Sequence, residues 1–209
     1  WHAWDKSGGY GDKDPANVRN HFRRGLAYAI YLAVACVQGA GDLEAYRALY
    51  RQYVPAIEEL SKAGWEPIPY ATASQGAIAE RFGSFEQGEL HFTLRNYTDA
   101  PVQSKLVLDR QGLGIPAQAQ LVCMDILPAA PTLSAFAPEG QAIDLESQGS
   151  RAFWVGTRQQ AAQHGFRLAA ATLEKLERLF STEMKESDRA AWKTAVEMAR
   201  SGSQASGEQ

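Results

Sequence analysis

Polar and apolar side chains alternate along two runs in the centre of the chain. Leucine and phenylalanine take every second position in residues 90–95, and a similar alternation returns in residues 102–109. A period of two is typical of strands with one buried face. Asn96, Asp99 and Pro101, which lie between the runs, favour a turn. The pattern predicts an antiparallel hairpin whose polar face lies in solvent.

Further short runs with β-forming residues surround this hairpin. They predict strands at residues 78–82, 119–127, 132–136, 142–145 and 151–157, with 132–136 at a sheet edge. In the last of them Phe153 and Val155 share one face, and Trp154 lies on the other. Strands this short, separated by frequent turn signals, predict a small antiparallel β-sandwich.

Apolar residues recur at helical spacing before the sandwich. One helix is predicted from Val18 to about Val37, ended by Gly39 and Gly41, with Asp14 and Pro15 as its start.

A second predicted helix covers residues 42–64 and contains Pro55, which should bend or split it. Residues 65–70 include two prolines and predict an extended linker into the sheet region.

The end of the chain returns to helical periodicity. Residues 166–180 are amphipathic, and a shorter helix is predicted over residues 188–200 with Ser187 as its N-cap. The fold class is therefore α+β. The predicted segments are helices in 1–72, the sandwich in 73–158, amphipathic helices in 159–200 and a disordered tail in 201–209.

Composition excludes several functional classes. The net charge of -3 and the absence of a basic run argue against nucleic-acid binding. The most hydrophobic run, residues 25–40, is shorter than the roughly 20 residues that cross a bilayer, so no membrane association is expected. Cys36 and Cys123 are interpreted as buried small apolar residues, with a disulfide left open.

Motifs for catalysis are absent. The chain has no GxSxG, GxxxxGK[ST], HExxH or CxxC motif, so no cofactor and no metal site is expected. Asp5, Asp12 and Asp14 lie among aromatic residues in 1–14, a loop composition that suits ligand contact, but nothing fixes two of them at a catalytic separation. The glycosylation acceptor pattern at Asn96 coincides with the predicted turn.

The order of these elements resembles a known family. The runs HFRRGLAYAIYLAV, YRALYRQYVPAIEELSKAGWEPI, IAERFG and GELHFTLRNYTDAPVQSKLVLD follow one another. In this order they resemble the C-terminal part of bacterial glycoside hydrolases, which are built as a (β/α)8 barrel followed by an antiparallel β-sandwich. The likeness covers roughly residues 1–157 and includes no catalytic motif.

The resemblance implies a role for each segment. Residues 18–64 would be the closing helices of the barrel, and residues 1–14 the loop after its last strand, where such barrels bind substrate. The residues placed near the sugar would be Trp1, His2, Trp4 and Asp5.

The resemblance also places the catalytic carboxylates on earlier strands, outside this chain. A chain that starts at Trp1 is then expected to be an inactive fragment of a longer enzyme.

Two other functions stay open on the sequence. The sandwich could be a carbohydrate-binding module that uses surface aromatics such as Tyr97 or Trp154. The chain could also have a purely structural or interaction role. The C-terminal helices depart from the family pattern, and they could pack on the first helical segment or mediate association with another chain.

Overall fold

The computed structural model describes residues 15–31, 46–127, 132–180 and 185–205. The chain divides into two compact units, Trp1–Val155 and Gly156–Gln209. The α+β prediction is confirmed, because helices and two antiparallel sheets make up the described residues. None of the described helices is both long and apolar enough to span a bilayer.

Helix α1 (Pro15–Ala27) ends earlier than the sequence predicts. The N–H of Ile30 donates to the carbonyl of Gly25 at 2.9 Å, and the N–H of Ala29 donates to that of Leu26 at 3.3 Å. This pair of bonds is a Schellman motif, with Ala29 in the left-handed region at φ 49°. The prediction of helix to residue 37 is therefore wrong at residues 28–31. Residues 32–37, and Cys36 with them, lie outside the described residues.

Replacing Ala29 with glycine is expected to stabilise the protein by about 0.5 kcal/mol, because glycine adopts a positive φ without a Cβ clash. The gain is small because Ala29 also contacts the core beneath the helix. Chemical denaturation would measure it. Ala27→Gly, at the last residue of the helix, is the matched control and should destabilise by about 1 kcal/mol, because Ala27 has helical backbone geometry and a buried methyl group. A loss of stability in Ala29→Gly would contradict the prediction.

Helix α3 (Arg47–Ala63) continues through Pro55, so the predicted split does not occur. Pro55 and Arg51 lie on the exposed side of the helix, where water can hydrate a carbonyl that lacks its donor. The helix ends at Gly64, as predicted, and the N–H of Gly64 donates to the carbonyl of Leu60 at 3.1 Å.

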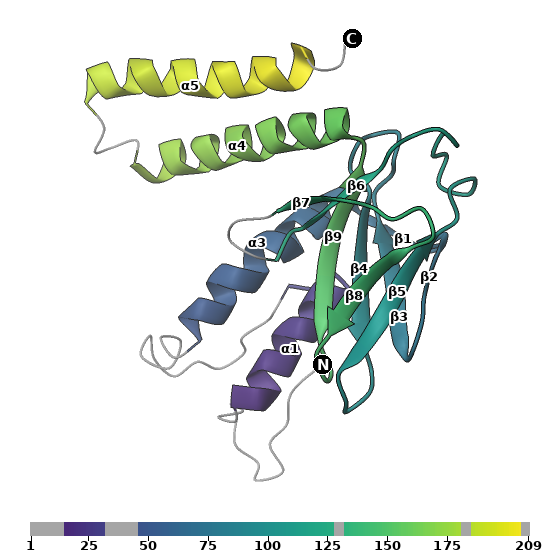
Figure 1. Cartoon of the computed structure of the whole chain (residues 1–209). Coiled ribbons are helices and arrows are strands. Elements are labelled where there is room, and N and C mark those ends of the chain that lie inside the picture. Colours follow the sequence, from purple (N-terminus) through teal and green to yellow (C-terminus); the bar gives the residue numbers. More distant parts are fainter. Residues whose placement is uncertain (1–14, 32–45, 128–131, 181–184, 206–209) are drawn as a thin grey trace. The chain divides into compact units, whose positions relative to one another are not determined.

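In the part of the chain that the structure describes, nine strands form two antiparallel sheets, whose strands are labelled in Figure 1. The six-stranded sheet has the order β1-β3-β4-β9-β6-β7, and the three-stranded sheet has the order β2-β5-β8. The strands are β1 (Trp65–Glu66), β2 (Ala71–Ala73), β3 (Ala77–Phe82), β4 (His91–Asn96), β5 (Val102–Leu108), β6 (Val122–Asp125), β7 (Leu133–Ala135), β8 (Gln141–Leu145) and β9 (Ser150–Gly156). The prediction of an edge strand near 132–136 is confirmed by β7, whereas the predicted linker contains strand β1.

The predicted central hairpin does not form. Strand β4 pairs with β3 and β9, whereas β5 pairs with β2 and β8 in the other sheet. Side chains of both strands meet in one apolar core, to which Phe92 and Leu106 contribute from the two sheets. The alternation thus identified the core-facing residues correctly. It could not show whether two strands pair or face each other across the core.

The turn between β4 and β5 has the chemistry that the sequence predicts. The Oδ1 of Asn96 accepts hydrogen bonds from the backbone N–H and the hydroxyl of Thr98, both at 2.8 Å. The Nδ2 of Asn96 donates to the carbonyls of Ala100 at 2.8 Å and Glu146 at 2.9 Å. Because this amide is buried and fully bonded, the glycosylation acceptor is not accessible in the folded protein.

The second unit is a pair of helices, α4 (Arg158–Phe180) and α5 (Glu186–Ala205), which pack on each other. A capping box starts α4: the N–H of Thr157 donates to the Gln160 side chain at 2.9 Å, and the N–H of Gln160 donates to the Thr157 hydroxyl at 3.2 Å. Helix α5 starts at Glu186, so Ser187 lies in its first turn and not at the N-cap. It also extends to Ala205, into the stretch predicted to be disordered.

Candidate functional site

The four residues predicted to contact substrate, Trp1, His2, Trp4 and Asp5, lie outside the described residues. The described part of the first unit shows instead how the sandwich is attached to the helices that precede it. In Figure 1, α1 and α3 lie on the same side of the sandwich as the six-stranded sheet. Contacts of α1 with β4 and of α3 with β3 place both helices on that sheet.

Strand β4 is buried on both faces. All its residues are buried, including the polar residues His91, Thr93 and Arg95, which we call the polar stripe. The prediction that this face lies in solvent is therefore wrong. The physical reason is that helices α1 and α3 cover it and supply hydrogen-bond partners that replace water.

Two residues of the polar stripe bond to α1. The hydroxyl of Thr93 donates to the carbonyl of Ala27 at 2.7 Å. This carbonyl is in the last turn of the helix, where carbonyls lack intrahelical donors. The Nη2 of Arg95 donates to the Oδ1 of Asn20 at 3.0 Å. One buried and one partly buried contact, separated along α1, therefore fix the position of this helix on the sheet.

The third residue of the polar stripe bonds to α3. Nε2 of His91 lies 2.9 Å from Oε1 of Glu59, and Nδ1 lies 2.9 Å from the backbone carbonyl of Glu89. Both ring nitrogens therefore have an oxygen partner within the first unit.

An apolar core surrounds these polar contacts. It joins residues from both helices to residues on the outer face of the six-stranded sheet. Its buried members are Phe22, Leu26, Tyr53, Ala56, Ile57, Leu60, Phe82, Leu127 and Ala152. The helical layer thus shares a core with the sheet, in addition to the core between the two sheets.

Replacing Thr93 with valine should lower the free energy of unfolding by about 1–2 kcal/mol, because valine keeps the shape but leaves the Ala27 carbonyl without its donor. Urea denaturation would measure the change. Thr93→Ser is the matched control, since it keeps the hydroxyl. An equal loss of unfolding free energy in both variants would show that the effect comes from packing, and it would contradict the prediction.

Arg95 is a buried cation held by neutral acceptors. Its Nη1 donates to the Ser150 hydroxyl at 3.2 Å and to the Gln148 carbonyl at 3.4 Å, and its guanidinium lies 5.2 Å from the centre of the Tyr97 ring. Within the described ranges no carboxylate forms an ion pair with it. Burial lowers the pKa of this guanidinium, because it is removed from water.

The aromatic residues proposed for sugar contact differ in exposure. Trp154 is fully buried, and its indole N–H donates to the carbonyl of Gly88 at 3.0 Å. Tyr97 is 42% exposed, and its hydroxyl contacts that of Tyr28. Burial, together with this hydrogen bond, raises the pKa of Tyr97 to about 12, so it is neutral at physiological pH. Trp154 is therefore not available to a ligand in this fold.

Trp65 is an exposed aromatic residue that the sequence pattern did not indicate as a binding residue. Trp65, in edge strand β1, is 57% exposed, and its indole N–H donates to Oε2 of Glu80 at 2.9 Å. This hydrogen bond orients the indole. The sequence did not indicate Trp65 as a binding residue because the two prolines that follow it predict an extended linker and not the edge of a sheet.

Cys123 is a buried free thiol in the core between the sheets, 3.3 Å from the Ser134 hydroxyl, and burial raises its pKa. The prediction of a small apolar role is confirmed for this cysteine.

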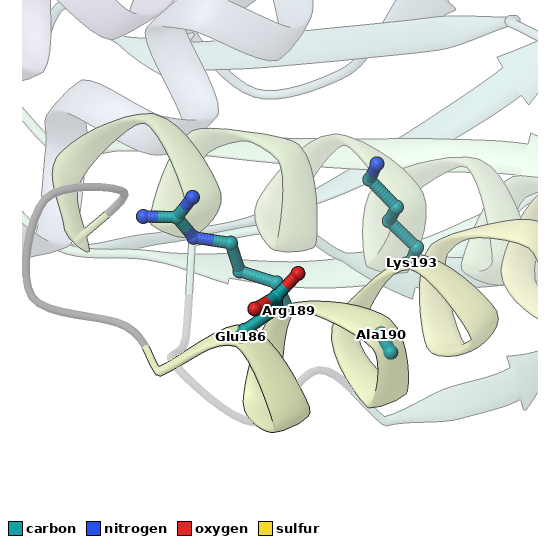
Figure 2. A pocket seen from close by; sticks show the side chains of 4 residues that line it. All are labelled: Glu186, Arg189, Ala190 and Lys193. Atoms are coloured by element: carbon teal, nitrogen blue, oxygen red, sulfur yellow. The ribbon is translucent and has the colours of Figure 1, made fainter.

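In the second unit, a depression along α5 is lined by Glu186, Arg189, Ala190 and Lys193 (Figure 2). Its lining residues come from a single helix and have mixed charge.

Comparison of the chain with protein-family models, with curated proteins and with solved structures gives no match. A function must therefore be argued from the elements described above and from the resemblance of the sequence runs.

Proposed function

We propose that this chain is the C-terminal portion of a carbohydrate-active glycoside hydrolase. In this proposal α1 and α3 are the last helices of the catalytic barrel, and the sandwich is an accessory domain attached to them. The main catalytic carboxylates lie outside this chain. The proposal rests on the resemblance of the sequence runs and on one structural observation, the attachment of the helical layer to the sandwich.

The attachment favours an accessory domain over an independent binding module. A free sandwich has no need of helices on its outer sheet face, whereas an accessory domain must hold a fixed position on the helices that lead into it. Thr93 and Arg95 bond to α1 from within the sheet, and an apolar core continues around them. Buried hydrogen bonds of this kind favour one register over others, because displacement leaves polar groups unpaired.

Several of the carboxylates that the structure describes in the first unit are engaged in local contacts. Glycoside hydrolysis needs two carboxyl groups across the scissile bond, roughly 5 Å apart in retaining enzymes and farther apart in inverting ones. Examples of these local contacts are Glu59 with His91, Glu66 with Arg81, and Glu80 with Trp65. The resemblance places the catalytic pair in a part of the enzyme that precedes these residues.

The coding sequence upstream of Trp1 tests the proposal. The expected result is roughly 250 further residues, as in a barrel, with acidic residues at the ends of predicted strands. The longer protein should hydrolyse at least one substrate in a panel of aryl glycosides, and the 209-residue chain alone should hydrolyse none. A start codon close to Trp1, or a longer protein without glycosidase activity, would contradict it.

A second candidate function is non-catalytic carbohydrate binding by the sandwich. The observation that favours it is the exposed and oriented indole of Trp65, since aromatic faces stack on the apolar side of sugar rings. Glu80 adds a carboxylate beside the indole, which can accept hydrogen bonds from sugar hydroxyls and disfavours anionic ligands. Sugar binding through Trp154 is excluded, because this residue is fully buried.

Replacing Trp65 with alanine tests this second function. Native gels containing hydroxyethylcellulose, arabinoxylan or soluble starch should retard the wild-type protein in at least one case, and Trp65→Ala should weaken that binding about tenfold or more. Tyr31→Ala, which removes a comparably exposed aromatic outside the sheets, after the end of α1, is the matched control and should bind normally. Absence of retardation, or equal retardation of all three proteins, would reject the second function and leave the first untouched.

A further inference from the structure

We draw no further inference here: the strongest candidate, the exposed apolar side chains Leu168, Leu179, Phe180 and Met198 on the surface of the α4–α5 helix pair, carries nothing because no feature of the described residues shows what covers them.

Discussion

Replacing Arg95 with methionine is expected to lower the free energy of unfolding by about 3 kcal/mol. Methionine has a similar length and avoids the cost of burying a charge. It nevertheless leaves Asn20, Ser150 and the Gln148 carbonyl without the donors that Arg95 supplies. Hydrogen bonds to a charged group contribute more than neutral ones, and buried acceptors left unpaired add their desolvation cost. The loss is therefore expected to exceed the gain from removing the charge.

Urea denaturation at neutral pH would measure this effect. Arg19→Met is the matched control, because Arg19 is an exposed arginine of α1 and its replacement should change stability by less than about 0.5 kcal/mol. Arg95→Lys should recover only part of the loss, since lysine cannot reproduce the planar set of donors. An Arg95→Met protein as stable as the wild type would show that the polar stripe contributes little to attachment of the helices.

Replacing Asn96 with aspartate should destabilise the protein by about 3 kcal/mol at neutral pH. The side chain keeps its size, but the Nδ2 donor becomes a charged oxygen that faces the carbonyls of Ala100 and Glu146. Two hydrogen bonds are thus replaced by repulsion between buried oxygens. The contact with Glu146 also ties the β4–β5 turn to the turn before β9, so both turns should loosen.

Thermal and urea denaturation would measure the Asn96→Asp effect. Asp99→Asn makes the reverse exchange in the same turn, at an exposed residue whose side chain accepts one hydrogen bond from Gln148, and it should change stability by less than about 0.5 kcal/mol. Part of the Asn96→Asp loss should be recovered in acid, where a protonated aspartate regains one donor. A loss below about 1 kcal/mol would contradict the role assigned to this amide.

The side chains that form the sandwich core could be predicted from the sequence, but the pairing of strands could not. Phe92 and Leu106 lie on alternating runs, and both face the core as the period of two indicates. Pairing depends on contacts between residues far apart in the chain. A turn as polar as that at Asn96 suits a hairpin and a crossing between sheets equally well.

The length of α1 could not be predicted because periodicity does not show where a helix ends. The apolar pattern continues past Ala27, and no glycine or proline occurs at the observed end. Ala29 takes the left-handed conformation that glycine usually supplies, held there by the Schellman hydrogen bonds. A local rule that searches for glycine places the end at Gly39.

The attachment site was missed because polar side chains in a strand usually face water. His91, Thr93 and Arg95 are polar enough to suggest a wet face, and only the helices packed on them make that face buried. The sequence contained one hint. In the neighbouring strand β9, the face that carries Trp154 is apolar, which indicates that another element packs on it.

We infer that the helical layer and the sandwich form one cooperative unit, held by the polar stripe and the core around it. Hydrogen exchange of the native protein, followed by mass spectrometry over a range of low urea concentrations, tests it most directly. In one cooperative unit, the amides of α1 and α3 open with the same free energy and the same urea dependence as those of β3, β4 and β9. If the amides of the two helices exchange several orders of magnitude faster while the sheet stays protected, the helices and the sandwich do not form one cooperative unit.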